Sequence, residues 1–150
     1  MGNKHTFSFR QLSEEHIHAF TLFVRASKIN DSLSVIMLKQ ILDNNVINCK
    51  KELSNRIPGA KLIIGNRFAK SLEAEILLLT NMTAAIQELK SCHQTIIYFL
   101  AARFGKKDQW IQLWKNQLDS MVRYVTYDTD ENQQLCLQAA IALGESFDLA

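Results

Sequence analysis

The fold of this chain is set by the stretch RFAKSLEAEILLLTNMTAAIQELKSCHQTIIYFLAARF, residues 67–104. Its stripe residues recur three, four or seven positions apart, which is the period of a buried helix face. They are Leu72, Ile76, Leu79, Ile86, His93, Ile97, Leu100 and Phe104. A second apolar row runs beside the first, so other helices have to surround this stretch. We therefore predict an all-α protein, a compact bundle of five to seven helices around a long central helical element.

Length argues against one unbroken central helix. Thirty-eight residues (67–104) at about 1.5 Å per residue would span about 57 Å. A compact domain of this size is only roughly 40 Å across. Polar residues gather around Lys90, Ser91 and His93, and we expect the break near residues 90–91.

Composition supports one helical domain. One proline and five glycines leave little material for turns, so the segments between turns should be long. We predict a flexible N-terminal arm (residues 1–11) followed by a single α-helical domain (residues 12–150). No window approaches 18 uncharged apolar residues, so no membrane span is expected. Three dispersed cysteines, without a secretory signal, favour free thiols in a reducing, cytoplasmic compartment.

Local signals place the helix ends. Ser13 is expected to cap the first helix, which should end near Ile29. The second helix should run from Leu33 to about Asn55, and Asp108 and Asp130 should cap the last two. The last helix should bury a stripe of Leu135, Ala139, Ala142, Leu143 and Phe147.

The second predicted helix is apolar on two faces in its first half. Its main stripe consists of Val35, Leu38, Leu42, Val46, Cys49 and Leu53. A second apolar face adds Leu33, Ile36, Met37 and Ile41. Beyond this second face, Asp43, Asn44 and Asn45 are poor helix formers and could kink the helix.

Charge is unevenly distributed along the chain. Between residues 50 and 70, six basic residues accompany Glu52 alone: Lys50, Lys51, Arg56, Lys61, Arg67 and Lys70. Residues 126–150 contain five acids and no lysine or arginine. The basic segment indicates a surface for an acidic protein partner, with nucleic acid or an anionic membrane as alternatives.

Trp110 and Trp114 lie one helical turn apart, a spacing found in cores and in interfaces. Together with the basic segment they favour a non-enzymatic protein-interaction module of the adaptor, regulator, chaperone or pathogen-effector type. We predict that it docks partners through charged and tryptophan-containing surfaces. The predicted partner-binding residues are Trp110, Trp114, Lys50, Lys51, Arg56 and Lys61.

Other functional classes stay open on weaker patterns. His93 lies in the middle of an apolar seam and could bind a ligand or haem iron. A length of 150 residues with two helices after that histidine is similar to globins, although the proline-anchored bend of globins is missing. Arg10 and His16 have the R-x4–6-H spacing of helical nucleases of the HEPN class. Without a glycine-rich phosphate loop, an H-E-x-x-H or a C-x-x-C motif, we expect no catalytic residue, metal or cofactor.

The first residues match a lipidation pattern. Gly2 followed by a hydroxyl residue at Thr6 is the N-myristoylation signature. One acyl chain anchors only marginally, so the basic 50–70 segment would have to add attraction to anionic lipid. This predicts a membrane-tethered alternative to the cytoplasmic module.

Overall fold

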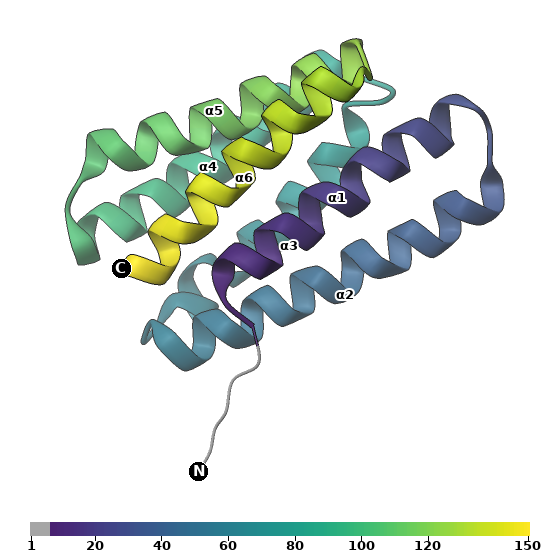
Figure 1. The fold of residues 1–150 in the computed structure, drawn as a ribbon. Helices are drawn as coiled ribbons and strands as arrows, with labels where there is room; N and C mark the ends of the chain where they lie inside the picture. The colour runs from purple at the N-terminus through teal and green to yellow at the C-terminus, as the bar shows by residue number, and fades with distance from the viewer. Residues whose placement is uncertain (1–6) are drawn as a thin grey trace.

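The computed structural model describes residues 7–150, and in that range it shows six α-helices and no strand (Figure 1). They are α1 (Phe9–Lys28), α2 (Ser32–Arg56), α3 (Ala60–Leu77), α4 (Met82–Phe104), α5 (Lys107–Thr126) and α6 (Asp130–Leu149). The predicted all-α bundle is thereby confirmed. Residues 1–6, with the Gly2 pattern and half of the predicted arm, lie outside the described residues.

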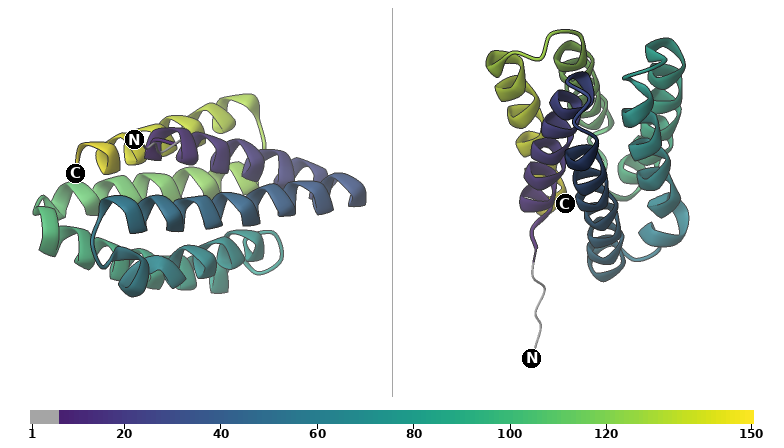
Figure 2. Two further views of the ribbon diagram at one scale, coloured as in Figure 1. Left: turned by 90° about the horizontal axis from the view of Figure 1, so that it is seen from below. Right: turned by 90° about the vertical axis from the view of Figure 1, so that its right-hand side faces the viewer.

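Each helix packs against its neighbour in sequence, and α6 returns to pack against α1 (Figures 1 and 2). At the α1–α6 contact a glycine is required. A Cβ added to Gly144 would lie 2.7 Å from both the Cα of Arg10 and the carbonyl oxygen of Phe9. Within the described range, no helix is long and apolar enough to cross a bilayer.

The core consists of two apolar clusters. One contains Phe20, Val24, Leu42, Leu72, Leu89, Met121, Tyr124 and Cys136 among others. The second contains Phe9, Leu12, Leu53, Ile64, Ile96, Leu100, Trp110 and Phe147 among others. Every helix contributes to both clusters, so every helix passes through the boundary between them. That boundary holds the cavity described below.

The central stretch is broken, as predicted, but at residues 78–81 and not at 90–91. The Asn81 side chain accepts a hydrogen bond from the amide of Ala84 and so caps α4. Lys90 and Ser91 lie on the exposed face of a continuous helix. Water solvates polar side chains there, so these residues do not interrupt the helix. The same stretch begins earlier than expected, because α3 starts at Ala60 and runs through Gly65.

Three predicted helix caps are wrong by one to five residues. Ser8, and not Ser13, caps α1: its Oγ accepts from the amide of Gln11, whose side chain accepts in return from the Ser8 amide. Because α1 begins at Phe9, the Phe9 ring can pack against Phe147 of α6, and this contact stabilises the earlier helix start. Thr129 takes the place predicted for Asp130, and α5 begins after Lys106 without a side-chain cap.

The predicted stripe of α6 is correct only in its second half. Leu143 and Phe147 are buried, together with Cys136, Ala140 and Gly144. Leu135 and Ala142 are exposed instead, and Ala139 is half-buried. The close approach at Gly144 fixes which face of α6 meets α1 and thereby turns those residues outward.

Candidate functional site

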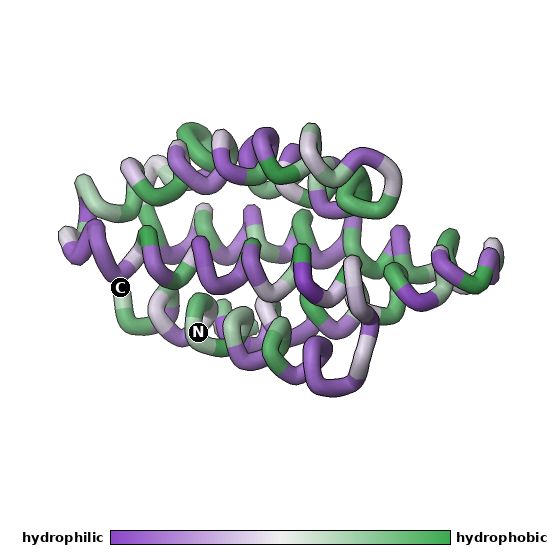
Figure 3. The backbone as a smooth tube through the Cα atoms, turned by 90° about the horizontal axis from the view of Figure 1, so that it is seen from above, coloured by the Kyte–Doolittle hydropathy of each residue, from purple (hydrophilic) through white to green (hydrophobic). Residues whose placement is uncertain are grey.

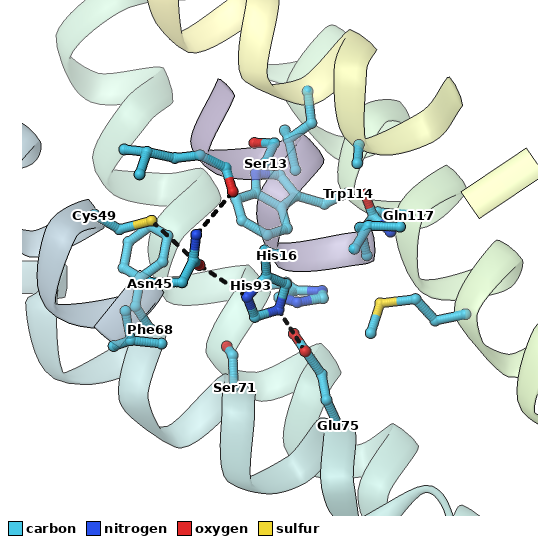
Figure 4. A pocket seen from close by; sticks show the side chains of 16 residues that line it. Ser13, His16, Asn45, Cys49, Phe68, Ser71, Glu75, His93, Trp114 and Gln117 are labelled. Carbon is cyan, nitrogen blue, oxygen red and sulfur yellow. Dashed lines mark hydrogen bonds and ion pairs between the residues drawn. The ribbon is translucent and has the colours of Figure 1, made fainter. Parts of the chain in front are cut away.

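A cavity of about 90 Å³ lies at the boundary between the two apolar clusters, and all six helices contribute to its lining. Several of the lining side chains are polar (Figure 4): Ser13, His16, Asn45, Ser71, Glu75, His93 and Gln117. Polar groups in a bundle interior are costly unless they are paired. Their hydrogen bonds therefore decide what the cavity can do.

His16 of α1 connects α2 and α3 through both of its ring nitrogens. Nε2 lies 2.6 Å from Oε1 of Glu75, and Nδ1 lies 3.0 Å from Oδ1 of Asn45. The Asn45 amide is oriented by its nitrogen, which donates to the carbonyl oxygen of Leu12 and to Glu15, both at 2.9 Å. With an acceptor at each nitrogen, His16 has to donate twice and is therefore an imidazolium.

The charge of His16 is consistent with its surroundings. Burial opposes that charge, but the carboxylate of Glu75 and the bond to Asn45 outweigh it and raise the pKa of His16 above its ordinary value. Glu75 is itself buried, so the two form an ion pair inside the bundle. Removing either partner would leave an uncompensated charge in a poorly solvated place.

The second histidine at the cavity behaves oppositely. His93 of α4 is buried and has no carboxylate partner in the described part of the chain. Burial lowers its pKa to about 4, so the ring is neutral at pH 7. It packs against Trp114 of α5 with ring centroids 4.6 Å apart.

The cavity does not fit a haem. Cofactor and drug-sized ligand sites typically measure about 300–1,000 Å³, several times the volume of this cavity. His93 also lines a groove of about 500 Å³, but that groove lies open on the outside of the bundle. No group of three or more histidine, cysteine or acidic side chains placed to hold a metal ion occurs within residues 7–150.

The structure disfavours two kinds of catalytic centre, a cysteine nucleophile and the predicted Arg10–His16 nuclease pair. Burial raises the pKa of Cys49 to about 12 and that of Cys136 to about 11, so neither is a thiolate nucleophile. The predicted nuclease pair is also separated. Arg10 is exposed and bonds Glu14 and Glu145, whereas His16 faces the cavity.

An exposed apolar row on α2 is the second candidate site. Leu33 is 69% and Met37 is 56% exposed, and Ile36 and Ile41 are also exposed. The opposite face of the same helix buries Leu42, Val46 and Leu53. The α1–α2 end projects beyond the other helices (Figure 2), and it carries both hydrophobic and hydrophilic residues (Figure 3).

The predicted basic residues separate into two groups. Lys50 of α2 and Lys61 of α3 both lie close to Gly65, where α2 and α3 pack together, because their Cγ atoms are 4.0 Å and 3.6 Å from a Cβ added there. Neither these two nor Lys51 has an acidic partner within salt-bridge distance among the described residues. We call Lys50, Lys51 and Lys61 the lysine cluster.

Arg56 does not belong to the lysine cluster. Its guanidinium pairs with Glu52 and Asp148, both at 2.9 Å, and donates to the carbonyl oxygen of Phe7. It also lies 5.0 Å from the centre of the Phe9 ring. Arg56 therefore joins the start of α1, the end of α2 and the end of α6.

The tryptophans do not lie on the surface where we expected them. Trp110 is 4% and Trp114 is 7% exposed, and both rings pack edge-on against Phe147 of α6. A pair one turn apart shares one helix face, and here that face is turned toward α4 and α6. The two tryptophan rings therefore do not form the exposed docking surface that we predicted.

Sequence reasoning missed the polar network of the cavity. The available signal was a polar residue within a buried stripe: Asn45 lies beside Val46, and Glu75 lies between Leu72 and Leu78. Such residues can also sit on the edge of a stripe and face water. Only the packing shows that Glu75 meets His16, 59 positions away.

Comparison with known proteins finds no matching family model, no similar curated protein and no similar solved structure.

Proposed function

We propose that this chain is a protein-interaction module that binds an amphipathic helix of a partner protein along the exposed face of α2. The observation that carries the proposal is the unpaired apolar row of Leu33, Ile36, Met37 and Ile41. Amphipathic helices are commonly recognised by such rows, with anchors at i, i+3, i+4 and i+7 spacing.

The lysine cluster specifies the charge of that partner. Lys51 follows Leu33 by 18 residues, which is five turns of 3.6 residues, so both lie on the same face about 27 Å apart. Lys50 and Lys61 lie beside this end of the row. A partner helix of similar length would place apolar anchors against Leu33 and Met37 and acidic residues against the lysines.

The arrangement of charges favours a protein over a membrane or nucleic acid. Helices that lie in a bilayer surface carry cations along their length and often aromatic residues on the apolar face. On α2, the lysines without an acidic partner lie at one end of the helix. In the apolar half, Lys39 is paired with Asp43. The row of Leu33, Ile36, Met37 and Ile41 contains no aromatic residue. A nucleic acid would use the lysines and leave the apolar row uncovered.

A synthetic 21-residue helix with a leucine row and glutamates in its last two turns tests the proposal. Its control carries lysines in place of the glutamates. Fluorescence anisotropy should detect the acidic peptide bound at least tenfold more tightly than the basic one.

Variants of the protein test which residues bind the peptide. The double variant Leu33→Asp/Met37→Asp should abolish binding of the acidic peptide, and the double variant Lys50→Glu/Lys51→Glu should weaken it at least tenfold. Leu149→Asp, at a residue that is 89% exposed elsewhere, should leave it unchanged.

Three outcomes would refute the proposal. The first is failure of both peptides to bind. The second is binding to phosphatidylserine vesicles that depends on Leu33 while the acidic peptide does not bind, which would assign the face to a membrane. The third is a dimer by light scattering that Leu33→Asp converts to a monomer, which would assign the face to a second copy.

A further inference from the structure

We propose that the central cavity is a binding site for a small neutral molecule with an apolar body and an oxygen acceptor, such as a short-chain amide or alcohol. This inference is independent of the proposed partner helix, because none of the α2 surface residues lines the cavity. It depends on unpaired hydrogen-bond donors, on the charge balance, on the cavity volume and on a route to the surface.

Three buried polar groups at the cavity lack a hydrogen-bond partner within residues 7–150. They are Nε1 of Trp114, Nε2 of Gln117 and Oγ of Ser71, and each of these residues is more than nine-tenths buried. The first two can only donate, and the hydroxyl can donate as well. Because unpaired buried donors are rare and costly, their grouping around one cavity indicates an occupant that offers acceptors.

The charges at the cavity require a neutral occupant. The imidazolium of His16 is already compensated by Glu75 at 2.6 Å, and the ring of His93 is uncharged at pH 7. A carboxylate or an ammonium group placed there would therefore be buried without a counterion, which is strongly unfavourable.

Volume and walls define the rest of the ligand. The cavity, at about 90 Å³, is smaller than the roughly 150 Å³ that holds benzene in an engineered protein interior. The apolar part of the lining includes Ile17, Phe68, Met121 and Leu143. The site therefore suits a molecule smaller than benzene whose acceptor faces α3 and α5.

The cavity shares lining residues with a surface groove between α4 and α5. The groove, of about 500 Å³, lies on the outside of the bundle. His93 and Trp114 line both the groove and the cavity, so their two rings, tilted by 39° with centroids 4.6 Å apart, separate the cavity from the groove. Rotation of either side chain would connect the cavity to solvent.

Propionamide, followed by two-dimensional ¹H–¹⁵N NMR of the full chain, tests the site. The Trp114 indole N–H should show a saturable shift as it donates to the amide oxygen. Trp110 serves as an internal control, since its indole nitrogen is also unpaired and buried but does not line the cavity. Propionate, similar in size but charged, should bind at least tenfold more weakly.

Variants at the cavity sharpen the test. Gln117→Met and Ser71→Ala should each weaken propionamide binding by about fivefold to tenfold, whereas Gln112→Met on the exposed side of α5 should bind like the parent. Peak dispersion in each spectrum confirms that the variant is folded. The proposal is overturned if neither indole shifts, if both indoles shift alike, or if both cavity variants bind as tightly as the parent.

Discussion

The interior of this bundle contains a charged, hydrogen-bonded network, whereas the first half of α2 presents isoleucine, leucine and methionine to water. Both regions depart from the usual sorting of apolar residues inward and charged residues outward. In the interior, His16, Asn45 and Glu75 satisfy one another across three helices, so that network is structurally complete. The α2 row has nothing in the described chain to cover it.

The difference shows how each region can serve a function. A buried ion pair adds little net stability compared with an apolar pair, but removing one partner alone leaves an uncompensated buried charge that strongly destabilises the fold. An apolar row that is mostly exposed adds little stability to the free chain. We therefore expect interior substitutions to change folding strongly and α2 substitutions to change binding alone.

Breaking the buried pair should have the largest effect. Glu75→Leu leaves the imidazolium of His16 without its counterion and should lower the free energy of unfolding by about 3 kcal/mol. Urea denaturation measures this change. The double variant His16→Leu with Glu75→Leu should recover at least half of the loss. A double variant as unstable as the single one would show that packing, and not charge, sets the cost.

Acid should weaken the fold through His93. An unfolded histidine takes up its proton near pH 6.5, but the folded one does so only near pH 4. The contribution of His93 to the free energy of unfolding is therefore fully present above pH 6.5 and is lost as the pH falls toward 4. The total loss is about 3 kcal/mol. Thermal or urea unfolding of His93→Gln across pH 4–7 should show a shallower decline than the parent shows. Parallel declines would contradict a neutral, buried His93.

His16 should act in the opposite direction. Because its folded pKa is raised above 6.5, its contribution is complete below pH 6.5 and is lost as the pH rises through the folded pKa. His16→Gln should remove this alkaline decline, as followed by thermal unfolding between pH 6 and pH 9. An unchanged decline in the variant would assign it to another group.

Changing the α2 row should have the smallest effect on folding. Leu33→Asp and Met37→Asp replace side chains that are more than half exposed, so each should alter the free energy of unfolding by no more than about 0.5 kcal/mol. If both variants unfold in urea at the same midpoint as the parent, whereas Glu75→Leu unfolds at a lower urea concentration, the contrast between the exposed row and the buried ion pair is supported. A loss above about 1 kcal/mol would mean that the row packs within the chain and is not an available surface.

The helices themselves were largely predictable, since their apolar periodicity is local. The second face of α2 was also visible in sequence, as Leu33, Ile36, Met37 and Ile41. What periodicity could not tell is which of two apolar faces meets the core. The Trp110–Trp114 row faces inward and the Leu33–Ile41 row faces outward, although both read as apolar helix faces.

The sequence by itself determined that this protein is an all-α bundle, because helix periodicity and the scarcity of glycine and proline are properties of neighbouring residues. Tertiary structure alone decided the cavity, its ion pair and the exposed row. His16 and Glu75 are 59 positions apart, and Lys50 and Lys61 come close together only because α2 and α3 pack against each other at Gly65. Contacts between helices depend on how each helix is rotated about its axis, and that rotation is set by packing of the whole bundle.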